Sequence, residues 1–346
     1  MNLDELYQRA AALERDGRWA EAEAAYRDLF DKELTANGNA PRAADALRHQ
    51  AVACRRQNRF EEAEELATLS WKVAELCGYV EGAARAVNGL AATYYWQGDL
   101  ARAKHLYETA QTLGLDAGDD EVIGFSCQNL SVIEFFTGDL REARSLCLEA
   151  IASAVRSGST RTTAGVYNNL GLICTDLREW MEAELYFDRG IEIAAENEDR
   201  ALLAILHTNR ARPLTKVGDF SPARASLAAA EAVAAHIGDR GTLAEIEVGR
   251  ATIARLQGDF AAADAHLSRA LSLSAEGGLE RENALAIEAL AQLRFEQGET
   301  SEAIDHLRRA SEIFRSLSSV RDTARVDARL TEWTVSVPLT TAGSAG

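Results

Sequence analysis

The chain has 346 residues, only 4 of them proline, and its 54 acidic against 37 basic side chains give a net charge of −17. It is 47% hydrophobic and 26% charged, which is typical of a soluble and strongly helical protein. The acidic balance argues against nucleic-acid binding, which needs a broad basic surface. No stretch approaches the roughly 18 consecutive apolar residues of a membrane helix, and the first residues lack the profile of a signal peptide. We therefore expect a cytoplasmic protein with no nucleic-acid and no membrane partner.

Five cysteines are scattered along the chain, and no two of them form a C-x-x-C pair. A chain of this length needs no disulfide bonds to hold its fold, so we expect reduced thiols. Cys54 and Cys174 fall at a large core position of the repeat described next, and Cys127 and Cys147 fall at other core positions. We expect these four thiols to be buried and unreactive.

A six-residue motif that ends in alanine recurs along the chain, and Gly98-Asp99-Leu100-Ala101-Arg102-Ala103 is one copy of it. The closing alanine moves by one step of 41 residues and then by six steps of 40. A period held this closely indicates a repeat architecture. The closing alanines are Ala22, Ala63, Ala103, Ala143, Ala183, Ala223, Ala263 and Ala303.

Each position of the motif has a physical reason. The glycine supplies the left-handed backbone that ends one helix, and the aspartate after it accepts from the free N–H groups of the next helix. In one copy Asn58 replaces the glycine and tolerates the same conformation, whereas Arg178 in another copy is a poorer replacement. The closing alanine lies where two helices cross closely. The motif therefore predicts a helix, a tight turn and a second helix in every repeat.

Three segments carry a more specific pattern, namely Asn169-Leu170-Gly171, Gly218-Asp219-Phe220 and Tyr107-Glu108-Thr109-Ala110. Through them the chain resembles the tetratricopeptide repeat family over about residues 3–315. The 40-residue period is longer than the roughly 34 residues common in that family, and the proline that usually closes each repeat is absent. In this respect the chain is most similar to kinesin light chain-like arrays.

The period and the resemblance together predict an all-α fold, a right-handed superhelical α-solenoid of about eight helical hairpins. A capping helix at 320–334 would close the single domain, which spans residues 1–334. The small, polar tail 335–346 has nothing to bury, so we expect it to be disordered. The hairpins are expected at 3–38, 41–78, 81–116, 120–157, 160–197, 200–237, 240–277 and 280–317.

Signatures of enzymes are missing from the sequence. It contains no G-x-G-x-x-G, no phosphate-binding P-loop, no H-E-x-x-H and no G-x-S-x-G motif, and its six histidines never pair at the spacing of metal ligands. We therefore predict no catalytic residue, no metal site and no cofactor.

In a solenoid of this kind the first helix of each hairpin lines the concave surface. Asn129, Asn169 and Asn209 stand at one position of three successive repeats, and Asn88 and Asn168 lie one residue from that position. The family resemblance implies that an asparagine here projects into the groove and binds the backbone of an extended peptide, because an amide both donates and accepts. The alternative is that these asparagines form hydrogen bonds between repeats, and the sequence does not decide between the two.

Apolar side chains accompany the asparagine row. Phe125, Val132 and Phe135 are spaced seven and three residues apart and therefore share one helix face. We expect this trio to contact a partner, with Tyr95 and Leu172 beside it on neighbouring repeats.

Three cations lie just past the asparagines in adjacent repeats. Arg212, Lys216 and Arg255 could receive a carboxylate, a phosphate or an acidic side chain, although scattered solvated cations would give the same pattern.

We therefore predict a non-enzymatic scaffold or adaptor that binds a protein or peptide in its groove. Its ligand would be an extended peptide or an amphipathic helix. One alternative is a regulatory sensor that binds a peptide or small ligand and controls a partner protein. A second alternative is an enzymatic activity inside the superhelix. The only support for it is that a superhelix encloses a cavity. The fold alone does not select the partner or the pathway.

Overall fold

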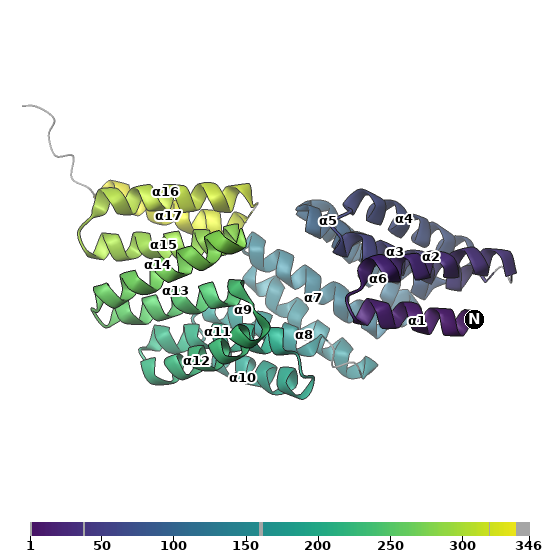
Figure 1. The fold of residues 1–346 in the computed structure, drawn as a ribbon, viewed down its shortest axis with the longest axis horizontal. Helices are drawn as coiled ribbons and strands as arrows, with labels where there is room; N and C mark the ends of the chain where they lie inside the picture. The colour runs from purple at the N-terminus through teal and green to yellow at the C-terminus, as the bar shows by residue number, and fades with distance from the viewer. Residues whose placement is uncertain (1, 37–38, 159–161, 318, 337–346) are drawn as a thin grey trace, which may run out of the picture. The chain divides into compact units, whose positions relative to one another are not determined.

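The computed structural model describes residues 2–36, 39–158, 162–317 and 319–336 (Figure 1). Within these ranges the secondary structure consists of 17 α-helices, and no strand is present. The helices are α1 (Leu3–Arg15), α2 (Trp19–Ala36), α3 (Ala40–Arg56), α4 (Phe60–Leu76), α5 (Val80–Gln97), α6 (Leu100–Ala117), α7 (Asp120–Thr137), α8 (Leu140–Ser157), α9 (Thr163–Asp176), α10 (Trp180–Glu196), α11 (Arg200–Val217), α12 (Phe220–Ile237), α13 (Arg240–Leu256), α14 (Phe260–Gly277), α15 (Glu280–Glu296), α16 (Thr300–Ser316) and α17 (Val320–Ser336).

The chain divides into two compact units. The first comprises Met1–Ile133 and Ser145–Thr162, and the second comprises Glu134–Arg144 and Thr163–Gly346. The division passes through α7 and α8, so that the two ends of each of these helices belong to different units. The second unit thus contains α9 to α17 together with the last residues of α7 and the first residues of α8.

Helical hairpins build both units. In the first unit α3 packs on α4 and α5 on α6, and in the second α9 packs on α10, α11 on α12, α13 on α14 and α15 on α16. Successive first helices also touch, because α11 packs on α9 and on α13, and α13 packs on α15. The eight closing alanines of the motif are all fully buried, as expected of residues at close helix crossings.

The tight turns have the expected left-handed backbone. Gly98 and Gly218 have φ angles of 84° and 83°, and the replacements Asn58 and Arg178 have φ angles of 59° and 63°. Glu198, which the sequence motif does not single out, also lies in this region with φ 54°. An L-residue other than glycine or asparagine costs roughly 1–2 kcal/mol there, so Arg178 and Glu198 are strained positions.

The aspartates after the glycines act as helix caps in most copies. Asp99 Oδ1 accepts from the backbone N–H of Arg102, and Asp259 Oδ1 accepts from that of Ala262, each over 3.0 Å. Asp219 forms no such side-chain bond although it stands in the same sequence context. The expected capping is therefore correct for Asp99 and Asp259 and wrong for Asp219.

The glycine of the Asn169-Leu170-Gly171 segment permits a close helix contact. A Cβ atom added at Gly171 would lie 2.5 Å from the ring of Phe187, which is fully buried on α10. The absence of a side chain at Gly171 therefore allows α9 and α10 to approach as closely as they do.

The last helix closes the core of the second unit. Val326 and Trp333 of α17 are buried in one cluster with Phe314 of α16, and the Trp333 ring stacks on Phe295 of α15 with 4.1 Å between centroids. The helix extends to Ser336, two residues past the predicted boundary, and residues 337–346 of the predicted tail lie outside the described residues. None of the helices in the described ranges is both long and apolar enough to cross a membrane.

Candidate binding surface on the first helices

The predicted site residues of the first unit lie on α5 and α7. Ser126 Oγ donates to Asn88 Oδ1 over 3.3 Å, so Asn88 takes part in a hydrogen bond between these two helices. Asn129 Nδ2 donates to the backbone carbonyl of Phe125 over 2.9 Å, one turn earlier in its own helix. Both amides are partly exposed but already have a partner. Tyr95, Phe125 and Val132 are likewise partly exposed.

The asparagines of the second unit separate into two groups. Asn209 Nδ2 donates to Asn168 Oδ1 over 2.9 Å, and these two side chains are only 5% and 9% exposed. Asn169, the next residue on α9, is partly exposed and has no side-chain hydrogen bond within the described residues. Asn168 and Asn209 are therefore engaged in packing between repeats, whereas Asn169 remains accessible to a ligand.

The apolar residues predicted to contact a partner have local contacts of their own. Leu172 packs against the buried cluster that contains Phe187 and Leu206. Phe135 lies edge-on to Phe136, with ring centroids 5.9 Å apart, and the guanidinium carbon of Arg321 lies 4.0 Å from the Phe135 centroid. The ring of Phe135 is thus partly covered by Arg321 of α17.

Charged side chains link the successive first helices of the second unit. Arg212 on α11 pairs with Glu245 on α13 over 3.2 Å, and Glu245 pairs in turn with Arg281 on α15 over 3.2 Å. Arg255 on α13 pairs with Glu296 on α15. Two of the three predicted cations therefore have an acidic partner inside the protein.

Lys216 differs from these two arginines. It is exposed, and within the described residues it forms no ion pair. Desolvation lowers its pKa, and the charges of Arg255, Arg329 and Arg178 lower it further, opposed by Glu288. Lys216 therefore stands in a positive potential, which an anionic group would relieve.

Arg212 is desolvated by neighbouring protein atoms but is not buried. Desolvation is the main cause that lowers its pKa, yet 43% of its side chain remains exposed to solvent. Arg212 and Lys216 lie one turn apart on α11, and both side chains are exposed, so they lie on the same face of this helix.

The basic face of α17 was not predicted from the sequence, from which this helix was expected only to cap the repeat array. Arg325 pairs with Glu288 over 2.6 Å and Arg329 pairs with the same carboxylate over 3.2 Å. Arg321 pairs with Asp176 at the end of α9. The three arginines are spaced by four residues and therefore share one helix face. This spacing is the sequence signal that could have indicated a row of ion-pairing arginines on α17.

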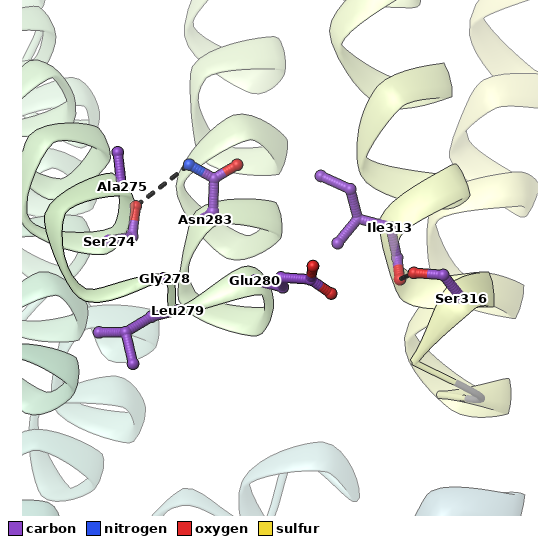
Figure 2. Close-up of a pocket in the computed structure, with 8 residues that line it drawn as sticks. All are labelled: Ser274, Ala275, Gly278, Leu279, Glu280, Asn283, Ile313 and Ser316. Carbon is purple, nitrogen blue, oxygen red and sulfur yellow. Dashed lines mark hydrogen bonds between the residues drawn. The ribbon is translucent and has the colours of Figure 1, made fainter.

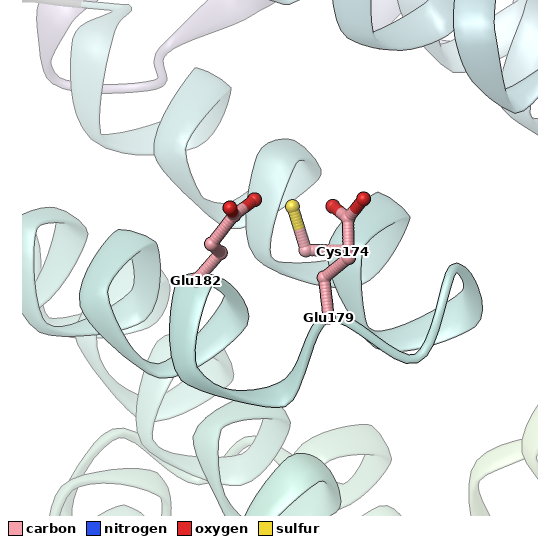
Figure 3. A group of neighbouring side chains, drawn as sticks. All are labelled: Cys174, Glu179 and Glu182. Carbon is pink, nitrogen blue, oxygen red and sulfur yellow. The ribbon is translucent and has the colours of Figure 1, made fainter.

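Cys174, Glu179 and Glu182 form the one group of side chains in the described ranges whose geometry could hold a metal ion, with ligand atoms within 4.8 Å of one another (Figure 3). Arg144 already pairs with both carboxylates, over 2.7 Å with Glu179 and 2.8 Å with Glu182. Burial raises the pKa of the Cys174 thiol to about 12, which disfavours the thiolate that a metal requires. The ion pairs with Arg144 account for this cluster without a metal.

A cavity of about 290 Å³ opens between α14, α15 and α16 (Figure 2). At its wall Asn283 Nδ2 donates to Ser274 Oγ over 3.2 Å, and Leu279 and Ile313 supply apolar surface. None of the predicted site residues lines it. Its few polar groups are partly used within the wall, so it is a weaker candidate for a binding site than the first helices.

Comparison with known proteins agrees with this architecture. Residues 242–316 match the family model described as Tetratricopeptide repeat. No curated protein matches the sequence.

Several solved structures are similar in fold. A Rap protein in complex with competence and sporulation factor has a TM-score of 0.63 and 14% identity, with 96% of each chain covered. Aspartyl phosphate phosphatase F from Bacillus subtilis has a TM-score of 0.55 and 10% identity, covering 100% of this chain and 97% of that one. BtubC (BKLC) from P. vanneervenii has a TM-score of 0.55 and 20% identity, covering 68% of this chain and 92% of that one. At these identities the similarity concerns the fold alone.

Proposed function

We propose that this chain is a binding protein that holds a protein or peptide segment against its first helices. Residues 242–316 match the tetratricopeptide repeat model, and the fold resembles that of the Rap protein, which supports this proposal. The repeat architecture supports this, because stacked hairpins present the same positions repeatedly along one extended surface. The Rap protein of similar fold was solved with a competence and sporulation factor bound, which supports a protein or peptide ligand for a surface of this type.

One observation carries the proposal. On the first helices of the second unit nearly every charged or amide side chain named above has an internal partner, but Asn169 and Lys216 have none among the residues that the structure describes. An amide can bind the backbone of an extended segment, and an unpaired ammonium can bind a carboxylate. These two groups are the ones that a ligand would satisfy.

Other predicted residues have a supporting part in this proposal. Arg212 and Arg255 keep their acidic partners and border the ligand through their exposed atoms, and Leu172 offers apolar contact. In the first unit the partly exposed side chains Asn88, Tyr95, Phe125, Asn129 and Val132 form a second candidate contact surface.

A pull-down from the native cell tests the proposal. The amount of partner retained by the variant Asn169→Ala/Lys216→Ala should be at least tenfold lower than that retained by the native protein, because two polar contacts of roughly 1 kcal/mol each are removed. Lys72→Ala, which removes an exposed lysine of the second helix α4, is the matched control and should bind normally. Undiminished retention by the double variant, with a helical circular dichroism spectrum, would show that the ligand binds elsewhere.

A regulatory form of the same function is the second candidate. The similarity to the Rap protein extends over 96% of this chain, and that protein was solved in complex with competence and sporulation factor. If this protein acts as a sensor, ligand binding should change its radius of gyration in solution scattering, whereas a static adaptor should keep the same radius. No catalytic step forms part of either proposal.

A further inference from the structure

Three residues from distant parts of the chain meet within the second unit. Phe135 belongs to the end of α7, Asp176 to the end of α9 and Arg321 to the first turn of α17. The Arg321 guanidinium lies over the Phe135 ring at 4.0 Å and forms an ion pair with the Asp176 carboxylate. Arg321 is 23% exposed and Asp176 30%, so solvent reaches this contact.

An aromatic face beside a carboxylate is a chemically specific receptor. The ring attracts a cation through its quadrupole, and the carboxylate accepts hydrogen bonds from the guanidinium N–H groups. A planar guanidinium satisfies both at once better than an ammonium does. Phe135 and Asp176 together therefore recognise an arginine side chain, and Arg321 shows the geometry.

The position of α17 does not depend on this contact. Val326 and Trp333 hold the helix through the buried cluster with Phe314, and Arg325 and Arg329 pair with Glu288. Removing the Arg321 side chain leaves all of these contacts in place. Arg321 can therefore leave Phe135 and Asp176 by side-chain rotation while α17 stays docked.

We propose that Phe135 and Asp176 form a subsite for an arginine side chain of a bound protein segment, and that Arg321 occupies this subsite until the segment displaces it. This inference rests on the proposed function, because it concerns the same layer of first helices and names the chemistry of the ligand. Arg321 is then a tethered competitor, since its attachment to α17 keeps it at a high effective concentration beside the subsite.

The competition has a measurable size. If Arg321 occupies the subsite about nine-tenths of the time, the apparent affinity for an arginine ligand is reduced roughly tenfold. Removing Arg321 should restore that factor. Removing Asp176 or Phe135 in addition should abolish the gain, because the receptor is then lost together with the competitor.

Fluorescence anisotropy with a labelled peptide amide that contains three arginines and otherwise glycines provides the test on the full chain. We expect Arg321→Ala to bind this peptide about tenfold more tightly than the native protein, and we expect Arg321→Ala/Asp176→Asn to lose that gain. Arg321→Met keeps the apolar stem of the side chain and serves the same purpose if the alanine variant unfolds.

Two controls separate the subsite from general attraction to an acidic protein. Arg329→Ala removes the same charge from the same helix and should give a much smaller gain, and a peptide with three lysines should gain less than the arginine peptide. The proposal is overturned if Arg321→Ala binds no more tightly than the native protein, if both peptides gain equally, or if Asp176→Asn leaves the gain intact. Such a failure leaves the pull-down test with Asn169→Ala/Lys216→Ala unaffected, so the two proposals fail separately.

Discussion

Asn209 donates a hydrogen bond from Nδ2 to the Oδ1 atom of Asn168 over 2.9 Å and so joins α11 to α9. The pair is buried, whereas the neighbouring Asn169 is partly exposed. Two residues adjacent in sequence, Asn168 and Asn169, therefore point to different environments, one between helices and one toward solvent. Asn168 and Asn209 thus form a hydrogen bond between repeats, which is one of the two roles considered for this row of asparagines. The other role, binding a ligand's backbone, stays a proposal for Asn169.

This difference predicts opposite effects for two alanine substitutions. Asn209→Ala should lower the free energy of unfolding by about 1–3 kcal/mol, because it leaves the buried Asn168 amide without its partner. Asn169→Ala should change stability by less than about 0.5 kcal/mol, as is usual for a surface substitution, but should weaken partner binding. Urea unfolding and pull-down measure the two effects, and equal loss of stability in both variants would contradict the assignment.

Gly171 should be intolerant of a side chain. In Gly171→Ala the new Cβ would meet the buried Phe187 ring at 2.5 Å, so we expect destabilisation by about 1–3 kcal/mol. The matched control is Gly89→Ala on α5, where a Cβ meets nothing within 4 Å and the substitution should stabilise by roughly 0.5–1 kcal/mol. Thermal unfolding of the two variants should therefore shift in opposite directions.

The strained turn at Arg178 predicts a stabilising substitution. Arg178→Gly should raise the free energy of unfolding by about 1 kcal/mol, because glycine adopts the φ of 63° without the steric cost that arginine has there. Gly98→Ala, at φ 84°, makes the reverse change and should lower stability by a similar amount. Denaturant midpoints that move the same way in both variants would refute this account of the turns.

Folding stability should fall as the pH drops through the histidine range. His49 is held between Glu14, 2.8 Å from its Nδ1, and Arg48, 2.9 Å from its Nε2. Burial lowers the pKa of His49 below its ordinary value, and the positive charge of Arg48 lowers it further. Below about pH 6.5 the unfolded chain therefore binds a proton at His49 that the folded protein does not, so acid favours unfolding until the lowered folded pKa is passed.

Urea unfolding at pH 7.5 and pH 5.5 measures this dependence. His49→Gln should reduce the loss of stability between the two pH values. Burial and Arg210 also lower the pKa of His207, so His207→Gln should remove a further part of the loss. His105→Gln, at an exposed position of α6, serves as the control. An unchanged pH dependence in the His49 and His207 variants would exclude these groups as its origin.

The sequence by itself determined the fold and its repeating turns. The period of the closing alanines, the glycines of the turns and the aspartate caps are local or strictly periodic features, and each acts through the backbone of its own hairpin. The structure accordingly shows helical hairpins, left-handed turns at Asn58 and Arg178, and full burial of Ala22, Ala63 and the other closing alanines. The four cysteines predicted to be buried, Cys54, Cys127, Cys147 and Cys174, are buried as well.

Only the tertiary structure decided which inward side chains remain available. Asn168 and Asn209 lie 41 residues apart, and Arg321 lies 186 residues from Phe135, so no local pattern specifies that they meet. Their contacts depend on the angles at which successive hairpins pack, because these angles determine the position of α17. A periodic sequence repeats the same side-chain positions in every hairpin, but it is the accumulated rotation between hairpins that selects the partners of each side chain.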